Sequence, residues 1–334
     1  MILKTIERHI MEEERKLGPT SGTFTNLLYD IAVAAKLISR EVRRAGLSDI
    51  VGATGDVNVQ GEAVQKLDVF SNDLLINVLS HSGRVCAIGS EENAEAILVD
   101  EQWAGKYVVN MDPLDGSGNI GVNASIGSIF SILPKASEGK MGTAEDCLQP
   151  GNRQLAAGYV MYGSSTVLVY STGFGVYGFT LDPTVGEFVL SHNQVRFPER
   201  CKYYSINEGY SAYWTEPTRR YIDYVKSIGD APNRPFGHRY IGAMVADYHR
   251  NMLDGGIFLY PQDTKDPNKA DGKLRLMVEA NPMAFLAEQA GGWASTGTQR
   301  ILDIIPSDLH QRVPVVIGNR EEVARYEEIA KGLA

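Results

Sequence analysis

The apolar positions between residues 25 and 46 recur every three or four residues, which is the spacing of one face of a helix. Thr25 offers a side-chain cap at the start, arginines occupy the last turn, and Gly46 follows them. The pattern therefore predicts a helix between Thr25 and Gly46 that packs its apolar face into the core. That face consists of Leu27, Leu28, Ile31, Ala34, Ala35, Ile38 and Val42.

Residues 46–66 lack this periodicity and are rich in glycine, which predicts a long loop of the kind that is usually mobile or functional. A second helix is predicted over residues 67–79. Asp68 stands at its start, where an aspartate is either a helix cap or, near other acids, part of a site. The sequence alone leaves both interpretations open.

Short apolar runs separated by turn residues dominate residues 85–190 and predict β-strands. The later runs are separated by short turns rich in glycine, serine or proline, which indicates a meander of neighbouring strands. The predicted strands are residues 85–88, 107–111, 124–133, 155–161, 166–170, 175–181 and 187–190.

From residue 203 onward strands and helices alternate, which is typical of a mixed α/β fold. A proline and several charged residues between 192 and 202 mark a boundary, so two domains are predicted, 1–195 and 196–334. One helix is predicted over 282–290, with Asn281 as its cap and a proline in its first turn. The other predicted elements are strands 203–206, 256–260, 274–278 and 313–317 and helices 221–228, 241–253 and 321–329.

The chain has 334 residues and a formal charge of −9, which argues against non-specific binding to nucleic acid or to an anionic membrane. Its first 16 residues lack the apolar core of a signal peptide, and no run approaches the length of a membrane span. The cysteines at 86, 147 and 201 have no paired spacing, which favours free, buried thiols. We therefore expect a cytoplasmic protein that acts on small molecules.

Two aspartates follow the apolar run over residues 107–111. Pro113 favours a type I turn, which would bring the Cα atoms of Asp112 and Asp115 within about 7 Å of each other. Two carboxylates about 4 Å apart repel by about 4 kcal/mol at an effective dielectric near 20. Such a pair is tolerated at a surface turn in open water or around a bound cation, and this stretch alone does not decide between them.

Acidic residues also follow two other apolar runs. Glu91 and Glu92 come after residues 85–88, and Glu279 comes after residues 274–278. Ligands of open α/β sheets bind beyond the carboxyl ends of the strands, so we expect these acids to share one site with the two aspartates. Their oxygen ligands suit a hard cation.

Features beside the predicted acid site suit a phosphate. The loop Gly116-Ser117-Gly118 has small residues that let backbone N–H groups approach an anion. On a strand, Lys273, Arg275 and Glu279 would share one face, so Arg275 would bind a phosphate there, although a salt-bridged surface strand is the alternative. Other polar and aromatic residues form either a second anion site or ordinary rim packing. They are Asn207, Tyr210, Arg239, Tyr240, Tyr260 and Lys273.

These motifs resemble class I fructose-1,6-bisphosphatase. Asp112-Pro-Leu-Asp115-Gly-Ser is similar to the metal signature of the lithium-sensitive phosphomonoesterases, to which that family belongs. The resemblance covers nearly the whole chain, with its motifs in the same order. The other matching segments are Lys66-Leu-Asp-Val, Ser71-Asn-Asp73, Ser90-Glu-Glu92, Gly105-Lys-Tyr-Val-Val109, Ser205-Ile-Asn-Glu-Gly-Tyr210, Met244-Val-Ala-Asp247, Gly272-Lys-Leu-Arg275 and Asn281-Pro-Met-Ala284.

The resemblance implies a two-domain, layered α/β/α/β/α sugar-phosphatase sandwich that assembles as a homotetramer. It also implies hydrolysis of the 1-phosphate of fructose 1,6-bisphosphate with Mg²⁺, or Mn²⁺ in its place. By motif position, the implied metal ligands are Glu91, Glu92, Asp112, the Leu114 carbonyl, Asp115 and Glu279. The implied catalytic residues are Asp68, Glu91 and Glu92, with Glu62 assisting and Arg275 binding the phosphate.

The same motif positions imply two phosphate sites. The scissile phosphate would contact Asp115, Gly116, Ser117, Gly118 and Arg275. The 6-phosphate would contact Asn207, Tyr210, Tyr240, Tyr260 and Lys273, with Arg239 reaching in from a neighbouring subunit.

Many relatives are inhibited by AMP, which binds at the start of the first long helix beside a Lys-Tyr pair. Pro134 stands where AMP-sensitive relatives often have an arginine, and proline offers no charged donor. We therefore predict weak or no inhibition by AMP. The positions that match the AMP site are Ser21, Gly22, Thr23, Thr25, Lys106 and Tyr107.

Three functions remain open from the sequence. The first is a fructose bisphosphatase, and the second is a phosphatase that acts on sedoheptulose bisphosphate or an inositol phosphate. The third is an inactive subunit that senses a metal or metabolite, and the complete acid set with Arg275 counts against it.

Overall fold

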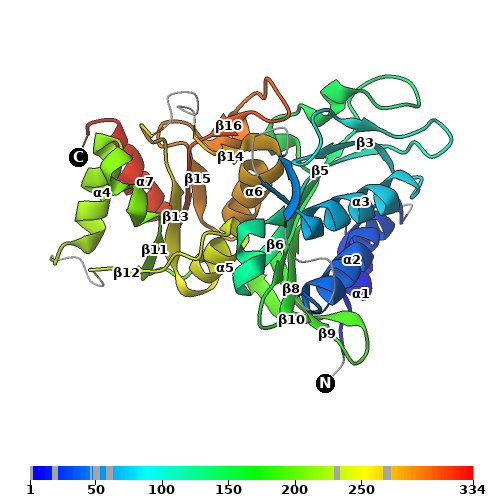
Figure 1. Cartoon of the computed structure of the whole chain (residues 1–334), viewed down its shortest axis with the longest axis horizontal. Coiled ribbons are helices and arrows are strands. Elements are labelled where there is room, and N and C mark those ends of the chain that lie inside the picture. The colour runs from blue at the N-terminus through cyan, green and yellow to red at the C-terminus, as the bar shows by residue number, and fades with distance from the viewer. Residues whose placement is uncertain are drawn as a thin grey trace.

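The protein is described by a computed structural model that covers residues 3–16, 22–45, 47, 53–57, 63–228, 234–265 and 272–333. Helices and two main sheets alternate in five layers, which Figure 1 shows edge-on. This is the α/β/α/β/α sandwich that the resemblance implies. Among the described residues, every helix is too short or too polar to cross a membrane.

The larger sheet has eight strands in the order β10-β9-β8-β7-β6-β5-β3-β4. Strands β3 and β5 are parallel, and β5 to β10 form antiparallel neighbours in chain order, so the predicted meander is confirmed. Helices cover both faces of its centre, which explains why the central strands β3, β5 and β8 are buried along their whole length. Their bounds are β3 Val85–Ser90, β4 Ile97–Leu98, β5 Tyr107–Asp115, β6 Ile126–Pro134, β7 Ala156–Tyr162, β8 Thr166–Ser171, β9 Val176–Asp182 and β10 Glu187–Val195.

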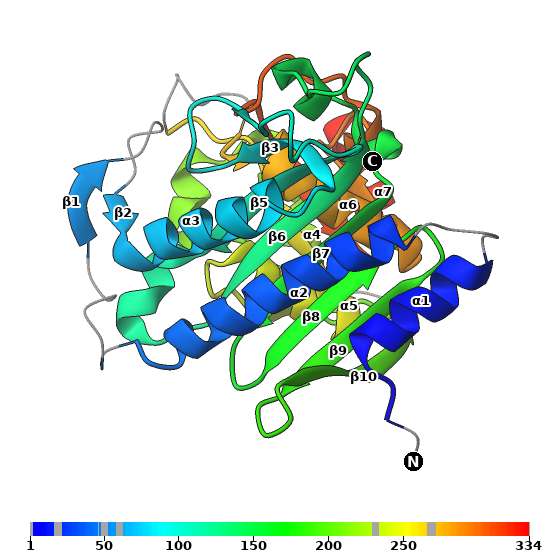
Figure 2. The same ribbon diagram turned by 90° about the vertical axis from the view of Figure 1, so that its right-hand side faces the viewer.

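Three helices lie across the outer face of this sheet, as Figure 2 shows: α1 (Ile6–Lys16), α2 (Thr23–Val42) and α3 (Lys66–Ser80). The sequence predicted α2 and α3, and the apolar face of α2 is buried as expected. The charged sequence of α1 concealed a helix that buries Ile6 and Ile10 against the sheet.

The start of α2 differs from the prediction. Gly22 occupies the N-cap position with a φ of 68°, so Thr25 is not the cap. The Thr25 hydroxyl instead donates a hydrogen bond to Glu14 of α1. Part of the predicted loop 46–66 is also ordered, since β1 (Ala53–Val57) and β2 (Ala63–Gln65) pair antiparallel.

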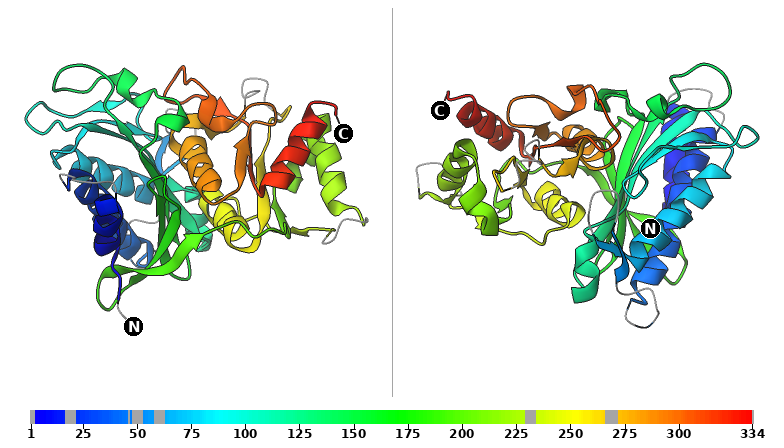
Figure 3. Two further views of the ribbon diagram at one scale, coloured as in Figure 1. Left: turned by 180° about the vertical axis from the view of Figure 1, so that it is seen from behind. Right: turned by 45° about the horizontal axis from the view of Figure 1, so that its top comes forward.

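The smaller sheet has the order β12-β11-β13-β17-β15. Helices α5 and α6 lie between the two sheets, and α4 and α7 cover the far face, as the two views in Figure 3 show. The bounds are α4 Glu216–Lys226, α5 Met244–Asp254, α6 Asn281–Gln289, α7 Arg320–Ala330, β11 Tyr203–Ser205, β12 Gly237–His238, β13 Gly256–Tyr260, β15 Trp293–Ser295 and β17 Val315–Gly318.

The predicted strand over residues 274–278 is wrong. Only β14 (Leu274–Arg275) is extended, and it pairs with β16 (Arg312–Val313). The chain then forms a π-helical turn, η6 (Leu276–Ala280), that continues into α6. Asn281 lies inside this continuous helical segment and is not a cap. Its buried apolar residues look alike in a strand and in a helix that is covered on all sides.

Candidate active site

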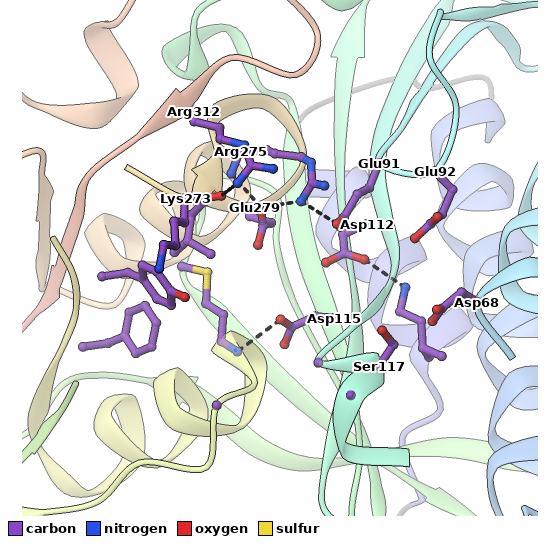
Figure 4. Close-up of a pocket in the computed structure, with 18 of the residues that line it drawn as sticks. Asp68, Glu91, Glu92, Asp112, Asp115, Ser117, Lys273, Arg275, Glu279 and Arg312 are labelled. Carbon is purple, nitrogen blue, oxygen red and sulfur yellow. Dashed lines mark hydrogen bonds and ion pairs between the residues drawn. The ribbon is translucent and has the colours of Figure 1, made fainter. Parts of the chain in front are cut away.

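A cavity of about 420 Å³ lies where the carboxyl ends of β3 and β5 meet the start of α5 and the turn η6. Acidic side chains line one end of it, and at the other end the rings of Tyr210 and Tyr260 gather around the Lys273 ammonium. Figure 4 shows the acids beside Arg275, with Lys273 and Arg312 on the side away from Asp68. The cavity therefore contains both groups of residues that the sequence singled out.

Asp112 and Asp115 meet because of a β-bulge, and the predicted type I turn is wrong. Strand β5 continues through both aspartates, and its pairing with β6 shifts between them. The Asp112 carboxylate accepts a hydrogen bond from Leu114 N at 2.9 Å. A bulge re-aims a side chain within a strand, so it brings the two carboxylates together as the turn would have done.

Glu91 and Glu279 complete the acid end. Glu91 N donates to Met111 O at 3.1 Å, which continues the β3–β5 pairing and brings Glu91 beside Asp112. Glu279 comes from η6, where its carboxylate accepts a hydrogen bond from Arg275 N at 2.6 Å. Carboxylate oxygens of Asp112, Asp115 and Glu279 all lie within 4.8 Å of one another.

Burial makes it costly to ionise these acids together. It raises the pKa of Asp115 to about 7, although hydrogen bonds from Met244 N and Val245 N at the start of α5 oppose the shift. Burial and then Glu91 raise the pKa of Glu279 to about 8. The pKa of Asp112 is raised well above its usual range by burial and by the neighbouring carboxylates.

Arg275 is the cation nearest to this cluster among the described residues that contact it. Its side chain is 4% exposed, and its guanidinium lies 2.5 Å from a Glu91 oxygen and 3.8 Å from a Glu279 oxygen. The single charge of Arg275 does not offset the four carboxylates of Glu91, Asp112, Asp115 and Glu279, so the acid end favours further cations. Converging carboxylate oxygens with raised pKa values fit a Mg²⁺-type ion.

Asp68 lines the cavity beside the acid cluster, and it is the third residue of α3, whose N-cap is Gln65, so the prediction that Asp68 is the cap is wrong. One of its oxygens accepts a hydrogen bond from Gln65 N at 2.9 Å, as in a capping box. Its other oxygen is buried and, within the described residues, has no hydrogen-bond partner. Burial raises the pKa of Asp68 to about 6. An acceptor of this kind beside the cavity can take a proton from water.

The loop after Asp115 requires glycine at one position and not at another. Gly116 has a φ of 77°, and a Cβ there would lie 2.4 Å from the Ala243 Cβ. A Cβ on Gly118 would meet no atom within 4 Å. Ser117 begins the short helix η1 (Ser117–Val122) and faces the cavity.

At the other end, Tyr210, Tyr240, Tyr260 and Lys273 line the cavity as the sequence suggested. Asn207 lies in a small adjoining pocket with Tyr210 and Tyr260. Arg239 is exposed and does not line the cavity of its own chain. Its guanidinium donates a hydrogen bond to His238 O at 2.7 Å.

Sequence analysis missed Arg312 and Met244, which also line the cavity. Arg312 donates to Lys273 O at 3.0 Å across the β14–β16 pair. No local signal predicts a pairing between two-residue strands so distant in the chain. Met244 lies in a segment that carried the family resemblance, but an apolar side chain gave no sign of a site.

Comparison with known proteins agrees with this geometry. Residues 4–193 match the family "Fructose-1-6-bisphosphatase, N-terminal domain", and residues 197–331 match "Fructose-1-6-bisphosphatase, C-terminal domain". The chain belongs to the fructose-1,6-bisphosphatase family.

Relatives of this fructose-1,6-bisphosphatase family member match it along nearly its whole length. The class 1 fructose-1,6-bisphosphatase of Chlorobium chlorochromatii is 55% identical, with 99% of this chain and 98% of that protein covered. The one from Oleidesulfovibrio alaskensis is 54% identical, with 97% of each covered. Leishmania major fructose-1,6-bisphosphatase in its holo form matches with a TM-score of 0.92 and 39% identity, over 99% of this chain and all of that one.

In this family member the start of α2 packs against Tyr107, one of the residues of the predicted AMP site. The ring of Phe24, which lies between Thr23 and Thr25, packs 5.6 Å from that of Tyr107. The Lys106 ammonium lies 5.3 Å from the Tyr107 ring centre, and Pro134 pairs with Tyr107 across the sheet. Gly22 directly precedes Thr23 in the chain. Ser21 and the predicted catalytic Glu62 fall outside the described residues.

Proposed function

We propose that this protein hydrolyses the 1-phosphate of fructose 1,6-bisphosphate to give fructose 6-phosphate and inorganic phosphate, with Mg²⁺ as the resident ion and Mn²⁺ as a substitute. The observation that supports this most is a single cavity with a buried acid cluster and Arg275 at one end and tyrosines with Lys273 at the other. A sugar that carries two phosphates presents one to each end.

The metal ions would be held at the acid end. When bound, they supply Lewis-acid polarisation of the phosphate and a water of lowered pKa. The carboxylate oxygens that converge there support this assignment. The proposed ligands are Glu91, Glu92, Asp112, the Leu114 carbonyl, Asp115 and Glu279.

The chain's own residues would position the phosphate and move the proton. Arg275 would exchange part of its contact with Glu91 for the scissile phosphate, where a guanidinium can form two parallel hydrogen bonds. Gly116, Ser117 and Gly118 would line the other side of that phosphate, with Asp115 next to them. The Glu91–Arg275 ion pair would thus keep the arginine in place before substrate binds.

Asp68, with Glu92, would orient the attacking water and accept its proton. The water oxygen forms the new bond to phosphorus, the bond from phosphorus to the oxygen on C1 breaks, and that oxygen takes up a proton. Glu62 remains a predicted assistant in this step. The buried, unpaired oxygen of Asp68 is the feature that suits it to this role.

The 6-phosphate would bind at the far end to Asn207, Tyr210, Tyr240, Tyr260 and Lys273. Arg239 would contribute from a neighbouring subunit of a homotetramer, which its exposed position supports. We also propose two domains, 1–195 and 196–334, each built around one of the two main sheets. Three free, buried cysteines agree with a cytoplasmic location.

A phosphate-release assay tests the proposed function. Fructose 1,6-bisphosphate, sedoheptulose 1,7-bisphosphate, fructose 1-phosphate and inositol 1-phosphate would be compared with and without Mg²⁺. We expect Mg²⁺-dependent release with the highest kcat/KM for fructose 1,6-bisphosphate. A higher value for another substrate would change the assignment, and no release from any of them would favour the inactive sensor.

A further inference from the structure

Two lysines converge on one tyrosine at the far end of the cavity. The Lys273 ammonium lies 4.3 Å from the centre of the Tyr210 ring, and the Lys265 ammonium lies 4.2 Å from the same centre. Lys273 and Tyr210 line the cavity, whereas Lys265 is exposed at its rim. Ammonium groups are attracted to aromatic faces at such distances. Two like charges against one ring form a local concentration of positive charge.

Asp263 holds both lysines in place through different oxygens. One carboxylate oxygen accepts a hydrogen bond from Lys265 N at 2.9 Å. The other lies 3.3 Å from the Lys273 ammonium, and the Asp263 side chain is only 10% exposed. The segment is anchored further by Thr264 N, which donates to Tyr213 O at 2.9 Å. Asp263 therefore fixes the backbone that presents Lys265 and the ammonium of Lys273.

The charges in this group do not balance. Asp263 offsets the charge of Lys273, so that ion pair alone is neutral. Within the described parts of the chain, no carboxylate lies within ion-pair distance of Lys265, so its charge is the surplus. A phosphate that bears about two negative charges needs such a surplus to be attracted to this end.

We propose that Lys265 is a further substrate-binding residue, which attracts the phosphate remote from the acid cluster, and that Asp263 is the positioning residue for both lysines. The proposal rests on the proposed function, because it assumes that a second phosphate binds beside Tyr210. The ligand class is a sugar with a phosphate at each end.

The test compares steady-state kinetics of the wild type, Lys265→Gln and Lys265→Arg in the presence of Mg²⁺. The gain from an exposed ion pair is modest, so Lys265→Gln should raise KM for fructose 1,6-bisphosphate about two- to fivefold. Its kcat should stay unchanged, its kcat/KM for fructose 1-phosphate should stay unchanged, and Lys265→Arg should restore KM. Lys140→Gln removes the same charge from an exposed residue that does not line the cavity, and it should behave as the wild type.

Asp263→Ala separates positioning from simple electrostatics. It removes a negative charge, so electrostatics alone would lower KM for the bisphosphate. We expect KM to rise severalfold with kcat unchanged. Asp263→Asn should recover part of the lost affinity, because asparagine keeps the acceptor for Lys265 N.

An unchanged KM in Lys265→Gln overturns the binding role, and an unchanged or lower KM in Asp263→Ala overturns the positioning role. Wild-type enzyme that releases no phosphate would instead overturn the proposed function.

Discussion

The two ends of the cavity are built on opposite principles. At the acid end, Asp112, Asp115 and Glu279 are buried on a bulged strand and a helical turn, and their pKa values are raised. At the far end, Lys273 and the exposed Lys265 lie against the ring of Tyr210, and no cluster of buried carboxylates is present there among the described residues. Burial strengthens the interactions between charges and makes an unbalanced charge costly. At exposed positions water and salt screen the charges, so each interaction is weaker.

This difference separates chemistry from binding. Charge changes at the acid end should lower kcat, because they alter ions and groups that touch the reacting phosphate. Charge changes at the far end should act on KM and on the preference for two phosphates over one. Variants at each end therefore test whether chemistry and binding are separated in this way.

The largest effect is expected for Asp112→Asn. It removes one ligand charge where carboxylate oxygens converge, yet the amide keeps the size and the acceptor for Leu114 N. We expect kcat to fall by more than about a hundredfold, since even groups behind metal ligands can cost that much. Circular dichroism should show an intact fold. Near-normal turnover at saturating Mg²⁺ would contradict the metal assignment.

Arg239→Ala tests the far end. A charged hydrogen bond contributes about 1.5–3 kcal/mol, so kcat/KM for the bisphosphate should fall about ten- to a hundredfold more than that for fructose 1-phosphate. If Arg239 acts across an interface, tetramers mixed with Asp112→Asn subunits should regain activity. Equal losses for both substrates would exclude Arg239 from the site.

The metal-free protein should become less stable as pH rises. Folding raises the pKa of Asp115 to about 7 and that of Glu279 to about 8, so between about pH 4 and pH 8 the folded state binds more protons than the unfolded state. The free energy of unfolding should then fall by on the order of a few kcal/mol across this range. Denaturant titrations with EDTA and with Mg²⁺ check this, and we expect Mg²⁺ to remove most of the fall. A metal-free stability that rises over this range would be inconsistent with the buried acid cluster.

Two glycines in the loop after Asp115 form a matched pair. Gly116→Ala forces a Cβ into a positive φ and against Ala243, next to the start of α5, so it should cost about 1–3 kcal/mol of stability and much of kcat. Gly118→Ala has open space and should change the melting temperature little. Thermal melts and initial rates of both variants measure the contrast. Equal effects would show that the loop geometry is not what matters.

The smallest effect is expected from AMP. Pro134 offers no donor beside Tyr107, and the Glu14 carboxylate, bonded to the Thr25 hydroxyl, places negative charge at the start of α2. Neither residue supplies a charged donor for a phosphate, so AMP should inhibit weakly or not at all when titrated against the initial rate at fixed Mg²⁺. Tight inhibition that disappears in Lys106→Ala would show that other residues replace the arginine.

The sequence predicted the elements with a clear period. The apolar residues of α2 recur at helical spacing, so only a helix would bury them on one face. The runs of the meander are short and separated by turn residues, so only strands would bury theirs. The sequence also predicted that Asp112 and Asp115 lie close together, but through a type I turn where the structure has a β-bulge. Either backbone geometry shortens the distance between the two residues. The proximity was therefore easier to predict than the backbone that creates it.

Three features could not be predicted because they depend on distant contacts. The run at 276–280 is buried on all sides, so its pattern does not distinguish a strand from the turn η6. The many charged residues of α1 obscure its apolar face in the sequence, and that face is recognised only once the sheet against which it packs is known. Arg312 reaches the cavity from the two-residue strand β16, and Lys265 contacts Tyr210 from a surface turn; neither segment carries a local signature.

The central claim is that the acid end carries out the chemistry while the far end only binds. ³¹P NMR of the products from fructose 1,6-bisphosphate tests it directly, because it shows which phosphate is removed. We predict inorganic phosphate and fructose 6-phosphate as the products, formed only when Mg²⁺ is present. Formation of fructose 1-phosphate, or equal turnover in EDTA, would contradict the account.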